Sequence, residues 1–78
     1  MSGPILIPER LRPKVQTFGE VSMGANRVAL VLKNGTIIDD VILAWGEEVV
    51  RVGGAEPQNI PVDDIVDVID RSYGPAGQ

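Results

Sequence analysis

The amino-acid sequence predicts an all-β domain: a small, strongly bent antiparallel barrel of five strands, with an extended N-terminal arm and a 3₁₀ turn or short helix near the C-terminus. Residues 27–54 form a nearly continuous apolar run rich in β-branched side chains, which is typical of strands. Turn-forming residues interrupt this run at Asn34 and Gly35 and again at Trp45 and Gly46. The run is therefore predicted to fold into three consecutive antiparallel strands.

The segment before this run is predicted to supply an arm and the first strand. Residues 1–13 contain three prolines, each of which removes an amide donor and fixes φ, so an extended arm is expected, with room for one helical turn over residues 9–12. Residues 14–21 open with alternating polar and apolar side chains, which favours a half-buried strand. The barrel domain is accordingly predicted to span residues 14–71, with a flexible tail at residues 72–78.

The central hairpin carries the clearest local signal. Alternate aliphatic side chains in residues 28–32 fall on opposite faces of the expected strand. Asn34 and Gly35 favour a type I′ turn after it, because both central positions of that turn need positive φ. The returning strand loses its alternation at Asp39 and Asp40. A bulge or sharp bend is expected there, which lets one strand serve both halves of a small barrel.

The C-terminal part has two interpretations. After residues 48–52 pair back on the preceding strand, the favoured one is a 3₁₀ turn over residues 62–65 followed by a strand over residues 66–69. The alternative is a helix over residues 61–72, because its aliphatic side chains keep helical spacing. The segment is short and dominated by β-branched residues, and this favours the strand.

Composition disfavours catalysis. The chain of 78 residues has neither Cys nor His, so it has no disulfide, no thiolate zinc site and no imidazole base. The sequence therefore predicts a protein that is not an enzyme and has no cofactor. Its first residues lack a basic n-region, and their apolar stretch is too short for a membrane span, so a cytoplasmic protein with no membrane partner is expected.

Three acidic doublets are the one constellation that could carry chemistry. Converging carboxylates bind Mg²⁺ or Ca²⁺, which keeps a carboxylate metal-dependent enzyme as a remote alternative. Each doublet falls at an expected bend, turn or 3₁₀ start, where solvated or capping acids are favoured, so no metal site is assigned. The doublets are Asp39-Asp40, Glu47-Glu48 and Asp63-Asp64.

The net charge of -4 disfavours a nucleic-acid partner, because an acidic protein body repels phosphate groups.

Residues 28–35 are similar to the opening of the first motif of the Sm-like family, one group of the SH3-type small barrels, and the resemblance extends over residues 27–52. It implies a five-stranded bent barrel that assembles into rings by pairing the edge strands of neighbouring subunits. The RNA-binding residues of the family are not matched. Asp40 stands where a second glycine is expected, and the family's later Asp and base-contacting Asn align with Gly46 and Val50. An Sm-like oligomeric RNA-binding protein is therefore the alternative function.

The surplus of apolar residues points to protein association. A sheet with one solvent-exposed face has polar residues at alternate positions of its strands, whereas residues 28–31 and 41–43 are apolar on both faces. A homo-oligomer or a protein partner, docked by strand addition to an edge, would cover the surplus. The sequence thus predicts a non-catalytic interaction or assembly module. Its interface candidates, two on the arm and four on the sheet, are Arg10, Arg12, Val31, Ile42, Trp45 and Val50.

Overall fold

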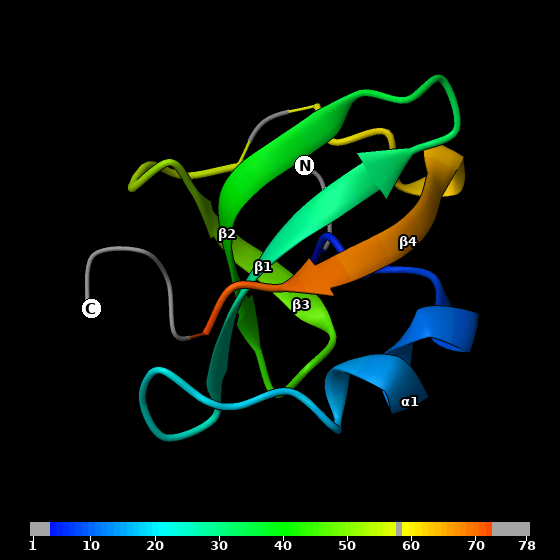
Figure 1. Ribbon diagram of the computed structural model, residues 1–78. Coiled ribbons are helices and arrows are strands. Elements are labelled where there is room, and N and C mark those ends of the chain that lie inside the picture. The colour runs from blue at the N-terminus through cyan, green and yellow to red at the C-terminus, as the bar shows by residue number, and fades with distance from the viewer. Residues whose placement is uncertain (1–3, 58, 73–78) are drawn as a thin grey trace.

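The computed structural model describes residues 4–57 and 59–72 (Figure 1). They form a four-stranded antiparallel sheet in the order β3-β2-β1-β4, with short helices before the first and last strands. The mostly β fold is confirmed, but the sheet is not closed into a barrel and the predicted fifth strand is absent from the described residues. The predicted tail lies outside them apart from Ser72. In chain order the elements are η1 (Glu9–Leu11), α1 (Arg12–Val15), β1 (Ala25–Leu32), β2 (Ile37–Ala44), β3 (Glu48–Val52), η2 (Val62–Asp64) and β4 (Ile65–Asp70).

The strand predicted over residues 14–21 is wrong. Val15 ends α1, and the N–H of Phe18 donates to its carbonyl (2.9 Å), so the chain continues in a turn. Pro13 lies in the first turn of the helix, where its fixed φ and missing N–H are tolerated. Leu11 and Val15, four residues apart, lie on one helix face and are both buried. The alternating residues that suggested a strand instead begin in a short helix that buries one face.

The N-terminal segment is extended only as far as Pro8 and is part of the packed structure. The N–H of Ile7 donates to the carbonyl of Glu47 (2.9 Å), and the N–H of Val49 donates to the carbonyl of Ile5 (2.8 Å), so the segment pairs with the outer edge of β3. The helical turn expected over residues 9–12 is confirmed, because η1 and α1 follow at once. Ile7 is 1% exposed. The predicted arm is therefore a structural segment whose side chains enter the core.

Bulges bend the sheet. Each of the three strand pairings contains one extra residue on one side. In β2 the irregularity falls at Asp39 and Asp40, and Asp40 has a φ of 55°. In β3 and β4 the extra residues are Val50 and Val66. The bulge predicted in the second strand is confirmed, and together the three increase the local twist so that short strands curve around one core.

The turn after β1 is confirmed, but its type is not I′. The N–H of Leu32 donates to the carbonyl of Thr36 (2.8 Å), which leaves a loop of three residues. Gly35 has a φ of 93°, whereas the φ of Asn34 is not positive. The N–H of Thr36 donates to Oδ1 of Asn34 (2.9 Å), so the asparagine supplies a side-chain acceptor. This is the hairpin in which a type I turn is followed by a left-handed residue.

The C-terminal strand settles the two interpretations of that segment. The 3₁₀ turn η2 followed by β4 confirms the favoured one, and the helix is wrong. The bulge at Val66 explains the helical spacing, because it brings Ile65 and Val68, three residues apart, to the same buried face.

The core lies between the concave side of the sheet and the N-terminal helices (Figure 1). Its buried residues all have aliphatic side chains: Ile7, Leu11, Val15, Val28, Leu30, Leu32, Val41, Leu43, Val49, Ile65 and Val68.

Candidate functional site

Trp45 stands at the tip of the turn between β2 and β3 and is 71% exposed. Its φ is 56°, and that of the following Gly46 is 75°, the pair of positive values that a type I′ turn requires. For a bulky residue this backbone conformation is strained, and such strain persists only where the surroundings enforce it. Here the N–H of Trp45 donates to the carbonyl of Gly24 (2.6 Å). The backbone of Trp45 is therefore held in this conformation.

The indole ring rests face-on over the backbone of Gly24. A Cβ atom at residue 24 would fall 2.7–2.9 Å from three adjoining ring atoms of Trp45, namely Cη2, Cζ3 and Cε3. Nearly equal distances to adjoining atoms place that point above the ring plane and not at its edge. Only a residue without a side chain allows this approach, and the φ of 74° at Gly24 favours glycine as well.

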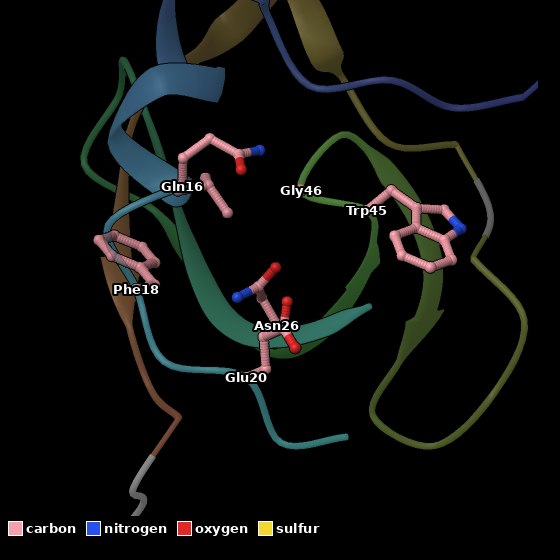
Figure 2. Close-up of a pocket in the computed structure, with 7 residues that line it drawn as sticks. Gln16, Phe18, Glu20, Asn26, Trp45 and Gly46 are labelled. Carbon is pink, nitrogen blue, oxygen red and sulfur yellow. The ribbon is translucent and has the colours of Figure 1, made fainter. Parts of the chain in front are cut away.

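A shallow cleft of about 80 Å³ lies beside the indole (Figure 2). In Figure 2 the side chains of Gln16, Glu20 and Asn26 point into the space between Phe18 and Trp45. Below, this space is called the Trp45 cleft. It is built from the end of α1, the loop that follows, the start of β1 and the turn after β2, and its lining residues are Val15, Gln16, Phe18, Glu20, Asn26, Trp45 and Gly46.

Two polar side chains of the Trp45 cleft are fixed by backbone contacts. Asn26 is 5% exposed, and its Nδ2 donates to the carbonyl of Gly19 (3.0 Å). No donor among the described residues reaches its Oδ1. Oε1 of Glu20 accepts from the N–H of Gly24 (3.3 Å), which places this carboxylate next to the residue on which the indole rests. An amide oxygen and a carboxylate therefore lie in one small space, and the indole lies next to it against Gly24.

The basic side chains of the protein are all occupied by its own groups. Arg10 donates to the carbonyl of Ile65 (2.8 Å), and Arg51 donates to that of Val50 (3.0 Å). The other five form ion pairs, whereas six of the eleven acids, Glu20 among them, have no basic partner among the described residues. The ion pairs are Arg12–Glu47 (3.7 Å), Lys14–Asp67 (2.6 Å), Arg27–Asp40 (3.5 Å), Lys33–Asp64 (3.3 Å) and Arg71–Asp39 (3.3 Å).

The acidic doublets do not converge on a metal site in the described part of the chain, where no group of three potential ligands occurs. Four of their six carboxylates, those of Asp39, Asp40, Glu47 and Asp64, instead form ion pairs with basic side chains. The hydrogen bond from the N–H of Asp40 and, next, the guanidinium of Arg71 lower the pKa of Asp39 below its usual value. The ammonium of Lys14 and the N–H of Val68 likewise lower the pKa of Asp67.

Of the six predicted interface residues, only Trp45 lines this cleft. Arg10 and Arg12 tie the N-terminal segment to the body, since Arg10 donates to the carbonyl of Ile65 and Arg12 forms an ion pair with Glu47. The predicted sheet positions Val31, Ile42 and Val50 are half-buried and lie on three different strands. Sequence reasoning missed the other lining residues because it placed several of them in a strand. The available signal was the pair of glycines that bracket the loop before β1, Gly19 and Gly24.

Comparisons with protein-family models, curated proteins and solved structures found no match for this chain. The resemblance to the Sm-like family stays a prediction. None of the helices in residues 4–57 and 59–72 combines the length and apolarity needed to cross a bilayer.

Proposed function

We propose that the protein is a non-catalytic interaction module that binds another protein chain, a second copy of itself included, through the surface around Trp45. The observation that carries the proposal is an exposed indole on a residue whose backbone has a strained, left-handed conformation. Tryptophan is enriched among the residues that dominate binding energy at protein interfaces. Its rigid side chain also loses little conformational entropy when it binds.

Apolar side chains extend this surface beyond the indole. Met23 is 90% exposed and precedes Gly24, on which the indole rests. Val21 is also exposed, and its N–H donates to the carbonyl of Ala25 at the start of β1 (2.9 Å). Val21, Met23, Trp45 and the Trp45 cleft are called the Trp45 surface below. Exposed apolar groups gathered beside a polar rim are typical of binding sites.

The edges of the sheet are less suited to docking than the Trp45 surface. Ile5 and Ile7 already pair with the start of β3. On β4, Oδ1 of Asp67 accepts from the N–H of Val68 (2.8 Å), and Arg10 donates to the carbonyl of Ile65. Side chains that occupy edge groups in this way oppose strand addition. The proposed mode of binding is therefore insertion of Trp45 into a partner surface.

The test combines a peptide selection with a measurement of mass. A random peptide library displayed on phage is selected on the wild-type protein, with Trp45→Ala as counter-selection, and sedimentation velocity gives the mass of both proteins. We expect either peptides that need Trp45 for binding or self-association that the substitution removes. Ile37→Ala is the matched control, because Ile37 is also an exposed apolar residue but lies at the other end of β2.

The control variant should behave as the wild type does in both assays. The proposal is overturned if the wild-type protein stays monomeric at about 500 µM, a concentration that detects even weak dimers, and no selected peptide distinguishes it from Trp45→Ala.

A further inference from the structure

We infer that the Trp45 cleft receives the guanidinium group of an arginine side chain from the partner chain. This inference rests on the proposed function, because it names the chemistry that the Trp45 surface recognises.

The charge of the cleft is the first support. Glu20 is the one charged residue among its lining residues, and no basic side chain of the described residues pairs with it. The surrounding protein is also acidic, with a net charge of -4 and its basic side chains paired internally. A cation that approaches this cleft therefore meets an unneutralised carboxylate and a favourable long-range field.

The exposed indole next to the cleft is the second support. Gly24 lies against part of one face of the indole, and the ring as a whole remains 71% exposed. A guanidinium group stacks flat on tryptophan, where the ring quadrupole attracts its charge. Glu20 accepts a hydrogen bond from the N–H of Gly24, the residue that covers part of the indole, so the carboxylate lies in the neighbourhood of the ring.

The size and the acceptors of the cleft are the third support. A volume of about 80 Å³ is well below that of a site for a drug-sized ligand, which needs about 300 Å³ or more, but it suits the planar end of one side chain. Oδ1 of Asn26 has no donor among the described residues, and the carboxylate of Glu20 has further acceptor capacity. Arginine presents five N–H donors in a fixed plane, so one guanidinium group can donate to more than one acceptor of the cleft.

A second copy of the chain is a poor source of this arginine. Each of its five arginines already forms an ion pair with a carboxylate or donates to a carbonyl of its own chain, and it would have to break that contact. A symmetric contact through the Trp45 surface would also bring two Glu20 carboxylates together. The geometry therefore favours a different, basic protein.

The test is an NMR titration of the full chain with N-acetylarginine N-methylamide and with the citrulline analogue, which has nearly the same shape but no charge. Side-chain amide signals of Gln16 and Asn26 and the indole N–H of Trp45 report binding at the cleft. We expect the arginine compound to bind at least about fivefold more tightly than the citrulline compound.

Two variants that each remove one negative charge locate the effect. Glu20→Gln keeps an acceptor for the N–H of Gly24 and should abolish the preference, whereas Glu56→Gln, in the loop beyond β3, should keep it. Equal binding of the two compounds, or equal behaviour of the two variants, overturns the inference. Peptides that require Trp45 but contain no basic residue would overturn it too, and they would leave the proposed function standing.

Discussion

The backbone of Trp45 has a left-handed conformation, which tryptophan disfavours. A left-handed conformation of a bulky residue costs about 1–3 kcal/mol, and Asn or Gly would adopt the φ of 56° with less strain. Most of the indole is in solvent, so its burial offsets little of this cost. A residue that weakens the fold while presenting an aromatic surface is better explained by binding than by packing.

The substitution Trp45→Asn tests this explanation. It places Asn-Gly, the preferred type I′ pair, in the turn between β2 and β3. We expect the free energy of unfolding to stay within about 1 kcal/mol of the wild-type value, because relief of strain offsets the lost contact with Gly24. Urea denaturation followed by circular dichroism measures it. Trp45→Ala, which keeps the strain, should be less stable than Trp45→Asn. A loss above about 2 kcal/mol in Trp45→Asn would instead identify the indole as part of the core.

Asp67 gives a second prediction at the residue scale. Its pKa is lowered in the folded protein by Lys14 and by the N–H of Val68, from an ordinary value of 3.8. A carboxyl group with a lower pKa in the folded state stabilises the protein above pH 4, and this contribution is lost as the pH falls through the folded pKa. Asp67→Asn should therefore be less stable than the wild type at pH 7, by about 0.5 kcal/mol for so exposed a pair, and equal to it near pH 2.

Denaturant titrations at several pH values measure this difference. The control is Glu56→Gln, since Glu56 has no basic partner among the described residues, and its stability should follow that of the wild type throughout. A difference between Asp67→Asn and the wild type that persists unchanged at pH 2 would contradict an ionic origin.

At the scale of elements, the N-terminal segment is the part that links the two edges of the sheet. Ile5 and Ile7 pair with β3, and Arg10 reaches the first residue of β4. Leu6 forms a bridge with Glu48, but its side chain points away from the core and is 37% exposed. The adjacent residues Leu6 and Ile7 thus differ in environment, because the first is partly in solvent and the second is buried in the core.

This contrast predicts unequal effects of two similar truncations. Ile7→Ala should lower the free energy of unfolding by about 2–4 kcal/mol, because it opens a cavity beside the core. Leu6→Ala should lower it by less than about 1 kcal/mol, because the side chain is partly in solvent already. Equilibrium urea unfolding compares them. Equal small losses in both variants would show that the segment detaches from the sheet in solution.

Elements with a local chemical signal could be predicted from the sequence. The Asn34-Gly35 turn needs a left-handed residue, the Asp39-Asp40 doublet breaks an apolar strand, and β-branched residues favour β4 over a helix. Helix α1 could not, because a four-residue helix shows too few residues to separate a period of 3.6 from a period of two. Its boundaries depend on tertiary contacts of Leu11 and Val15 with the core.

The candidate site was predictable only in part for the same reason. Trp45 is conspicuous as the one tryptophan, and its place at a turn follows from the glycine after it. The Trp45 cleft depends on how the loop from Gln16 to Gly24 folds back over β1. That path is fixed by long-range backbone contacts, such as the hydrogen bond from Trp45 to Gly24, and no local pattern encodes them.

At the scale of the whole molecule, the arrangement of charge separates the two functions that the sequence left open. RNA binding needs basic groups that are free to contact phosphates. In this protein the five ion pairs and the two bonds to carbonyls engage all seven basic side chains, and the net charge is -4. An RNA strand would have to displace internal carboxylates against a repulsive field.

The protein should therefore not bind single-stranded RNA even where electrostatic affinity is greatest. Fluorescence anisotropy of a labelled oligouridine at about 20 mM salt, with protein up to about 50 µM, should show no saturable change.

The double substitution Asp39→Asn and Asp40→Asn frees Arg27 and Arg71 from their ion pairs and lowers the negative charge of the protein. Any affinity for RNA should therefore appear in this variant first. Saturable binding by the wild type that weakens steeply with added salt would restore the RNA-binding alternative, because counterion release is its signature. Binding of RNA by the variant alone would instead show that the ion pairs of Arg27 and Arg71 prevent these side chains from contacting phosphate groups.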